Sequence, residues 1–130
     1  MMIKIKILFF LCFIFVFNYF SQELHPNTIK YSSEVFRDCM QYTQPQYLAE
    51  YSAQISRVSV IILPEQKRVG FPFLSEFGFK NKCNSDMIRD NKEIIVDDFN
   101  PLKYFFNFYS EIDQYIQIEN SSYVILISHK

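Results

Sequence analysis

Glycine and histidine are scarce in this chain, whose 130 residues include two of each: Gly70, Gly78, His25 and His129. Two isolated glycines exclude a glycine-rich loop that binds phosphate through backbone N–H groups. Neither histidine belongs to a cluster with the spacing of zinc ligands. The G-x-S-x-G and S-x-x-K motifs of serine hydrolases are also absent from the sequence. We therefore expect neither a metal nor a cofactor.

An excess of charge of one sign is missing too. Thirteen Lys and Arg residues and fourteen Asp and Glu residues give a formal net charge of −1. Basic residues are commoner in the segment 57–92 and acidic residues in 93–130. This distribution is typical of a mildly dipolar surface, and it gives no reason to expect a nucleic-acid partner.

The chain also lacks an apolar run of the length that ordinarily spans a membrane. Its start, MMIKIK, is followed by an unbroken apolar run over residues 7–17, whereas a spanning helix needs about 20 residues. Lysines before a short apolar block are typical of a secretory signal peptide. We predict a signal peptide at 1–22 and one exported domain at 23–130. Bulky Tyr19 and Phe20 make a poor cleavage site, so the alternative is a domain tethered to the membrane by residues 4–20.

Cysteine occurs three times, at Cys12, Cys39 and Cys83. Cys12 would leave with the signal peptide, and the remaining pair would enter an oxidising compartment. We therefore predict a disulfide between Cys39 and Cys83 and an extracytoplasmic location, either secreted or periplasmic. Two buried free thiols are the alternative.

Three segments have the features of helices. The first begins at Asn27 or Thr28, the second follows Pro45, and the third begins at Pro101 after the N-cap Asn100. Spacings of three and four residues predict the apolar stripes. In chain order these stripes are Ile29, Phe36, Cys39 and Met40; then Leu48, Tyr51 and Ile55; then Leu102, Phe105, Phe106 and Tyr109.

Strand patterns lie between and after these helices. Residues 58–63 and 93–97 are short and rich in β-branched residues, and we expect the first to be buried on much of both faces. Alternation at 114–119, a turn at Asn120 and Ser121, and the apolar stretch 123–128 predict a hairpin whose second strand is interior. We expect a small single α+β domain, with a mainly antiparallel sheet of four to five strands and helices packed on a face.

The long connection between the first two strands contains KRVGFPFLSEFGFKNKC, residues 67–83. A turn at 74–76 would fold its two pairs of phenylalanines together, with basic residues on both sides. One interpretation is an aromatic surface with cationic edges for a polyanion, a glycan or a protein. The favoured interpretation is core filling, because four exposed rings would promote aggregation. The candidate surface consists of Lys67, Arg68, Phe71, Phe73, Phe77, Phe79, Lys80 and Lys82.

Three functions remain open at this stage. The first is a non-enzymatic exported module that uses this surface to bind an unknown protein, envelope component or polymer. The second is a small hydrolase, and the third is a domain tethered to the membrane. The hydrolase would combine His25 or His129 with carboxylates from Asp97, Asp98, Glu111 and Asp113. Strand exit, turn formation and helix-dipole contacts are the favoured explanation of these carboxylates.

Overall fold

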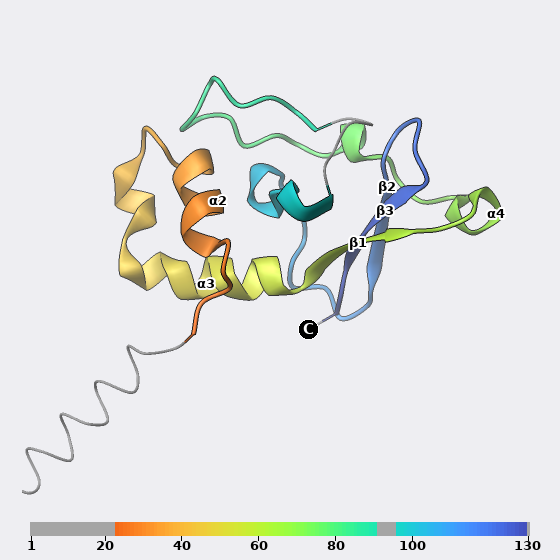
Figure 1. Cartoon of the computed structure of the whole chain (residues 1–130), viewed down its shortest axis with the longest axis horizontal. Helices are drawn as coiled ribbons and strands as arrows, with labels where there is room; N and C mark the ends of the chain where they lie inside the picture. Colours follow the sequence, from red (N-terminus) through yellow and green to blue (C-terminus); the bar gives the residue numbers. More distant parts are fainter. Residues whose placement is uncertain (1–22, 91–95, 130) are drawn as a thin grey trace, which may run out of the picture.

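The computed structural model describes residues 23–90 and 96–129 (Figure 1). The predicted signal peptide and most of the predicted strand at 93–97 lie outside these ranges. The last two residues of that strand pattern, 96 and 97, belong to a 3-10 turn at Val96–Asp98 instead. In the part of the chain that is described, no helix has the length and apolar character needed to cross a membrane.

Two helices form one side of the molecule: α2, Thr28–Val35, and α3, Pro45–Ser56, joined through a 3-10 turn at Met40–Thr43 (Figure 1). Helix α3 confirms the second predicted helix, although it begins at Pro45 itself and not after it. A third helix, α4, is a single turn at Glu65–Arg68 in the connection that was expected to be irregular.

The predicted stripe of the first helix is wrong. Helix α2 ends at Val35, and Ile29 and Met40 are 63% and 66% exposed. Tyr31 and Val35 face the core instead, where they pack with residues of α3. The buried face is partly polar. The buried Ser32 hydroxyl donates a hydrogen bond to the Thr28 carbonyl at 2.7 Å and so has a partner within the helix.

The other side of the molecule is an antiparallel sheet of β1, Val58–Ile62, β2, Gln114–Gln117, and β3, Tyr123–Ile127. The described residues form a sheet of three strands in the order β1-β3-β2, not the four to five predicted. The hairpin is confirmed: Asn120 has φ 55 at the turn, and the middle strand β3 is the most deeply buried.

The prediction that β1 is covered on both faces is wrong, because β1 is an edge strand with Ser59 and Ile62 exposed. The N–H of Leu63 donates to Ser122 and the N–H of Ser128 donates to Arg57. Because hydrogen bonding alternates along an antiparallel pair, the backbone groups of residues 58, 60 and 62 point away from β3. No hydrogen bond from these outward groups to another described residue is found.

The third predicted helix does not form. Asn100 and Pro101 begin a helical turn as expected, but it is a 3-10 turn that stops at Lys103. From Tyr104 the chain is extended, and alternate aromatic rings enter the core. Tyr104, Phe106 and Phe108 are buried, whereas Phe105 and Tyr109 are exposed. Phe79 forms an isolated antiparallel bridge with Tyr104, so this segment is held as a strand would be.

Two groups of buried side chains make up the core, and the segment 99–108 contributes to both. Leu102 packs with Tyr31, Val35 and Ile55 between the helices. Phe99, Tyr104, Phe106 and Phe108 pack against the sheet. In Figure 1 this segment accordingly lies between the helical pair and the strands.

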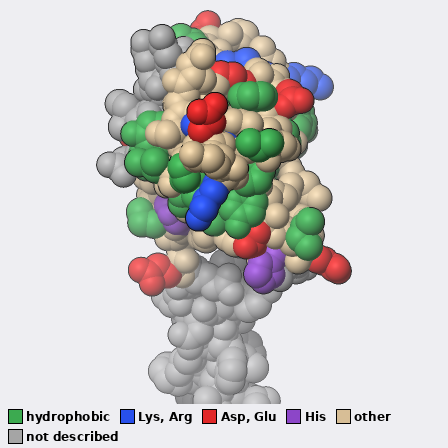
Figure 2. Space-filling view, turned by 90° about the vertical axis from the view of Figure 1, so that its right-hand side faces the viewer, with side chains coloured by type: hydrophobic (Ala, Val, Ile, Leu, Met, Phe, Trp, Pro, Cys, Tyr) green, Lys and Arg blue, Asp and Glu red, His purple; other side chains and the backbone are tan. Residues whose placement is uncertain are grey.

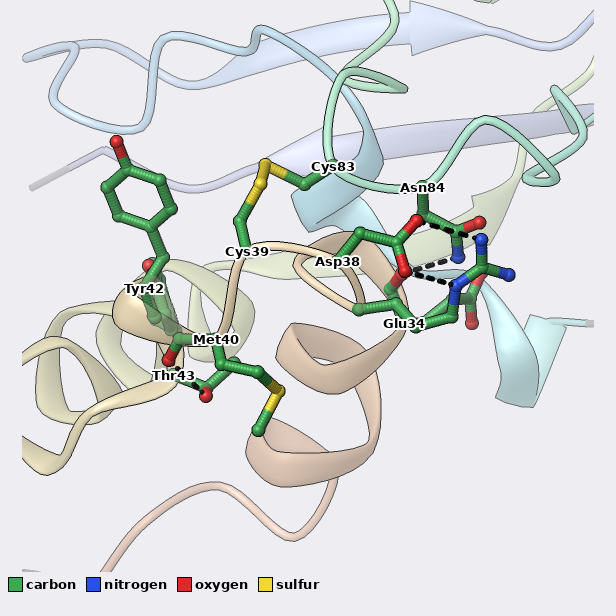
Figure 3. Close-up of a disulfide and its surroundings, with 10 residues drawn as sticks. Glu34, Asp38, Cys39, Met40, Tyr42, Thr43, Cys83 and Asn84 are labelled. Carbon is green, nitrogen blue, oxygen red and sulfur yellow. Dashed lines mark hydrogen bonds and ion pairs between the residues drawn. A yellow bond between two sulfur atoms is a disulfide. The ribbon is translucent and has the colours of Figure 1, made fainter.

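The disulfide between Cys39 and Cys83 is present, which confirms that prediction (Figure 3). It connects the chain just after α2 to the end of residues 67–83, which we call the aromatic segment, with 5.4 Å between the two Cα atoms. Two hydrogen bonds reinforce the connection: the Asp38 N–H donates to the Cys83 carbonyl at 2.8 Å, and the Asn84 side chain donates to the Glu34 carbonyl at 2.7 Å.

Removing the disulfide should destabilise the protein substantially. The cysteines are 44 residues apart, so the bond restricts a large loop in the unfolded chain. We expect replacement of Cys39 and Cys83 by serine to lower the free energy of unfolding by about 2–4 kcal/mol. Urea unfolding of wild type and variant measures this loss, and reduction of the wild type should produce a loss of similar size. Equal midpoints for the oxidised and reduced protein would contradict the prediction.

Asn100→Ala should also destabilise the fold. The buried Asn100 amide accepts from the Leu102 N–H at 3.0 Å and donates to the Tyr31 carbonyl at 3.1 Å. Alanine leaves the Leu102 N–H without its side-chain acceptor and removes the amide's bond to α2, and we expect a loss of about 1–3 kcal/mol in urea unfolding. Asn107→Ala is the control: the Asn107 side chain accepts from the Tyr109 N–H in an exposed position, so its loss should be about 1 kcal/mol or less. Equal losses for the two variants would show that Asn100 does not connect α2 to this segment.

Candidate functional site

The aromatic segment turns where it was expected to turn, but its phenylalanines do not pair across the turn. Leu74–Glu76 forms a 3-10 turn, and the Arg89 guanidinium closes it by donating to the carbonyls of Leu74 and Phe77 at 3.2 and 2.6 Å. Among the described residues, no ring of the first half contacts a ring of the second half. The two halves lie against different parts of the molecule.

The first half follows strand β2. Phe71 stacks on Tyr115 with ring centroids 5.1 Å apart, and the Gln117 side chain donates to the Phe71 carbonyl. Phe73 is 41% exposed. The Arg68 guanidinium donates to the Ser121 carbonyl at 2.7 Å and so binds the turn between β2 and β3. Lys67 is exposed.

Figure 2 shows the side of the molecule on which α4 and the strands lie. Hydrophobic, basic and acidic side chains are interspersed on this face, and none of the three kinds forms one broad patch. Phe71 is half-buried on Tyr115 and Phe73 is exposed, and a binding role for this half of the segment stays a prediction.

The second half of the segment packs inward. Phe77 meets Phe106 edge to face at 5.2 Å, and Phe79 lies 5.7 Å from the Tyr104 ring. Arg89 stacks its guanidinium over the Phe79 ring at 5.5 Å. These two phenylalanines are half-buried and pack against the core. The lysines that follow them are left at a groove.

This groove has a volume of about 290 Å³ and lies beside the disulfide. One wall comes from the end of α2, where Val35 and Phe36 contribute apolar atoms. The opposite wall comes from residues 79–83, which include two lysines and Cys83 of the disulfide. Phe105 completes the lining. None of the lining residues is acidic, so the groove combines an apolar surface with positive charge.

Backbone pairing holds the groove together. The N–H of Phe105 donates to Gly78 at 3.0 Å, and the N–H of Lys80 donates to Lys103 at 2.6 Å. A Cβ atom at Gly78 would stand only 2.8 Å from the Phe105 ring, so the absence of a side chain lets the ring lie over this position. Together with the disulfide, these contacts fix the wall formed by residues 79–83.

Lys80 is the most unusual charged group of the groove. Its ammonium lies 5.2 Å from the centroid of the Phe105 ring, a favourable cation–π distance. Burial lowers the pKa of Lys80 below the ordinary value for lysine, and the charge of Glu50 opposes this effect. Among the described residues, no carboxylate lies within ion-pair distance of Lys80 or Lys82.

Two important residues of this groove, Phe36 and Phe105, were assigned to buried helical stripes from the sequence. Phe105 is instead 63% exposed. Polar Lys103 and Asn107 have the same parity as Phe105, and this is a signal that would have indicated an extended segment with Phe105 facing outward.

The residues of the predicted hydrolase are only partly brought together. His129 Nδ1 lies 2.7 Å from a carboxylate oxygen of Asp113, and both side chains are solvent-accessible. The His129 backbone N–H also donates to this carboxylate, and these two bonds lower the pKa of Asp113. Asp98 pairs with Lys30 instead, and Glu111 is exposed. The side chain of Asp97 lies outside what the structure describes.

His25 occupies a different position, at a cavity of about 140 Å³ near β1. Its backbone N–H donates to the Ser52 hydroxyl at 2.7 Å, and its Nδ1 accepts from the Asn27 N–H. Both contacts anchor the chain before α2. Over residues 23–90 and 96–129, no group of three or more His, Cys, Asp or Glu side chains is placed to hold a metal ion.

Comparison with known proteins gives no relative for this chain. No protein-family model matches it, and searches of curated proteins and of solved structures find no match. Its function therefore has to be inferred from its own residues and their geometry.

Lys80 should make stability depend on pH in the alkaline range. Its folded pKa is below the unfolded value of 10.5, so the unfolded chain binds the proton more tightly. The free energy of unfolding should therefore rise with pH through the interval that ends at about 10.5, as the buried ammonium becomes neutral. Urea unfolding of wild type and Lys80→Gln over this interval isolates the contribution.

The variant should lose part of the rise, because glutamine carries no charge to neutralise. Lys67→Gln, at an exposed lysine of α4, should retain the wild-type dependence. A Lys80→Gln profile parallel to that of the wild type would show that burial does not perturb Lys80.

Proposed function

We propose that this protein is a non-enzymatic exported module that binds a ligand through the groove formed by the end of α2, residues 79–83 and Phe105. The observation that carries the proposal is the combination found there: an apolar groove with two lysines in its lining, no acidic residue in that lining, and no carboxylate partner for either lysine among the described residues. Core filling alone does not require lysines without partners at an open groove.

The disulfide supports both the proposed export of the protein and the proposed binding of a ligand in the groove. Disulfides persist mainly in oxidising compartments, so the bond between Cys39 and Cys83 favours a secreted or periplasmic protein. Cys83 also lines the groove, and the bond joins its two walls. A binding site whose walls are fixed in advance loses less conformational entropy when a ligand binds.

The hydrolase alternative has less support. His129 and Asp113 are in hydrogen-bond contact, which a general base would need. Among the described residues, Asp113 contacts His129 but no second carboxylate does, and both side chains are open to solvent. The groove lies elsewhere, because neither residue contributes to its lining.

The proposal is tested by charge reversal in the groove. The protein carrying Lys80→Glu and Lys82→Glu is immobilised beside the wild type and exposed, without reducing agent, to medium and envelope fractions of its native host. We expect the variant to retain at least one of the components that bind the wild type in an amount more than about tenfold smaller, because attraction at the groove becomes repulsion. Quantitative mass spectrometry of the eluates measures the ratio.

The matched control reverses two exposed lysines outside the groove, Lys30→Glu and Lys67→Glu. It has the same net charge as the groove variant and should retain the components that the wild type retains. If every retained component binds both variants as it binds the wild type, the groove is not the binding surface.

A further inference from the structure

We infer that the groove binds a small molecule with one carboxylate on an apolar body, held with its carboxylate at Lys80 and Lys82 and its body against Phe36 and Phe105. The inference rests on the proposed function, because it names the ligand class of the same groove. Four features of the described residues carry it: the apolar lining, the exposed ring, the lysines and the volume.

The apolar part of the ligand is indicated by the walls. Val35, Phe36, Phe79 and Phe105 bring aliphatic and aromatic carbon atoms to a groove that is open to solvent. The Phe105 ring is exposed, whereas its neighbours Tyr104 and Phe106 point the other way and are buried in the core. A ligand that covers this ring removes apolar surface from water, which contributes about 25 cal/mol per Å².

The anionic part is indicated by the lysines. Lys80 is half-buried, and among the described residues its ammonium interacts with the Phe105 ring and with the charge of the more distant Glu50. A carboxylate beside it would replace solvation lost through burial with a charge-assisted hydrogen bond. Lys82 and the Asn81 side chain, also in the lining, add donors at the same wall.

One negative charge fits this environment better than two. Taking a charge out of water is costly unless each charge is paired, and the cost grows with the charge carried. A phosphate monoester carries about 1.5–2 negative charges at pH 7. A half-buried lysine and one exposed lysine on an apolar wall therefore favour a monoanion over a phosphate.

The volume favours a free small molecule over a polymer. At about 290 Å³ the groove is near the lower end of the size range of small-molecule sites. Its two walls are joined by the disulfide, which limits how far they can separate. An acyl chain of moderate length or a ring with a carboxylate side group has the required size and shape.

The experiment uses octanoate as the probe, with 1-octanol and octylammonium as matched probes that have the same chain and a neutral or positive head group. The protein is produced from the 130-residue sequence and purified, with its disulfide intact, in the form that the host releases. Binding is followed by calorimetry and by chemical-shift changes in a two-dimensional NMR spectrum. We expect saturable binding of octanoate, with shifts concentrated at residues 79–83 and 105, and at least about tenfold weaker binding of the other probes, as loss of a charged hydrogen bond implies.

Variants separate the roles of the two parts. Lys80→Gln should weaken octanoate about tenfold and reduce the preference of the groove for octanoate over octanol, whereas Lys80→Arg should largely restore both. Phe105→Ala should weaken octanoate and octanol by similar factors, because it removes apolar contact from both. Lys67→Gln, outside the groove, should leave all three affinities unchanged.

Several outcomes would overturn the inference. Octanoate and octanol binding equally to the wild type would exclude recognition of the carboxylate, and this comparison needs no variant to fold. Binding of anionic phospholipid vesicles without binding of free octanoate would assign the groove to a membrane surface. If octanoate does not bind while the charge-reversed groove still loses a native component, the ligand class is wrong and the proposed function remains.

Discussion

Burial of the segment 99–108 between helices and sheet is the constraint on which the rest of the structure depends. The three-stranded sheet and the pair α2 and α3 do not make one continuous core by themselves, and this segment connects them. Leu102 enters the helical side, whereas alternate aromatic rings from Tyr104 onward enter the sheet side. Asn100 fixes the approach by bonding to the backbone of α2. Because a backbone buried on this scale has to be hydrogen-bonded, the segment pairs with residues 78–80.

The groove follows from that arrangement. Pairing with residues 78–80 leaves every second side chain of the extended segment facing outward, and Phe105 is the outward ring at this point. The same pairing directs residues 79–83 past the end of α2, where Cys83 meets Cys39 (Figure 3). Apolar and positive groups therefore gather beside the disulfide as a consequence of how the core is closed. The aromatic segment packs Phe77 and Phe79 against the core and places Lys80 and Lys82 at the groove.

Local signals predicted that α2, α3 and the hairpin form, because the N-cap Asn27, the helix boundary at Pro45 and the turn at Asn120 each act over a few residues. Periodicity nevertheless placed the wrong residues of the first helix in the core. The disulfide was predictable from the number and setting of the cysteines. The third helix was predicted wrongly, because Asn100 and Pro101 are strong start signals that here serve one turn only. Phenylalanine, tyrosine and asparagine are modest helix formers, so pairing with residues 78–80 prevailed. The groove could not be predicted from sequence, because its walls come from distant segments and one wall depends on the exposure of Phe105.

Strand β1 ends the sheet on a side where the backbone groups of Val58, Val60 and Ile62 have no protein partner among the described residues. Its five residues contain no charge and no proline, the features with which natural edge strands discourage intermolecular pairing. Among the described residues, this edge of the sheet is therefore open to pairing with a strand of another molecule. In crowded solution the first contacts between copies would be expected along it, and a lysine at Ser59 would act as a gatekeeper there.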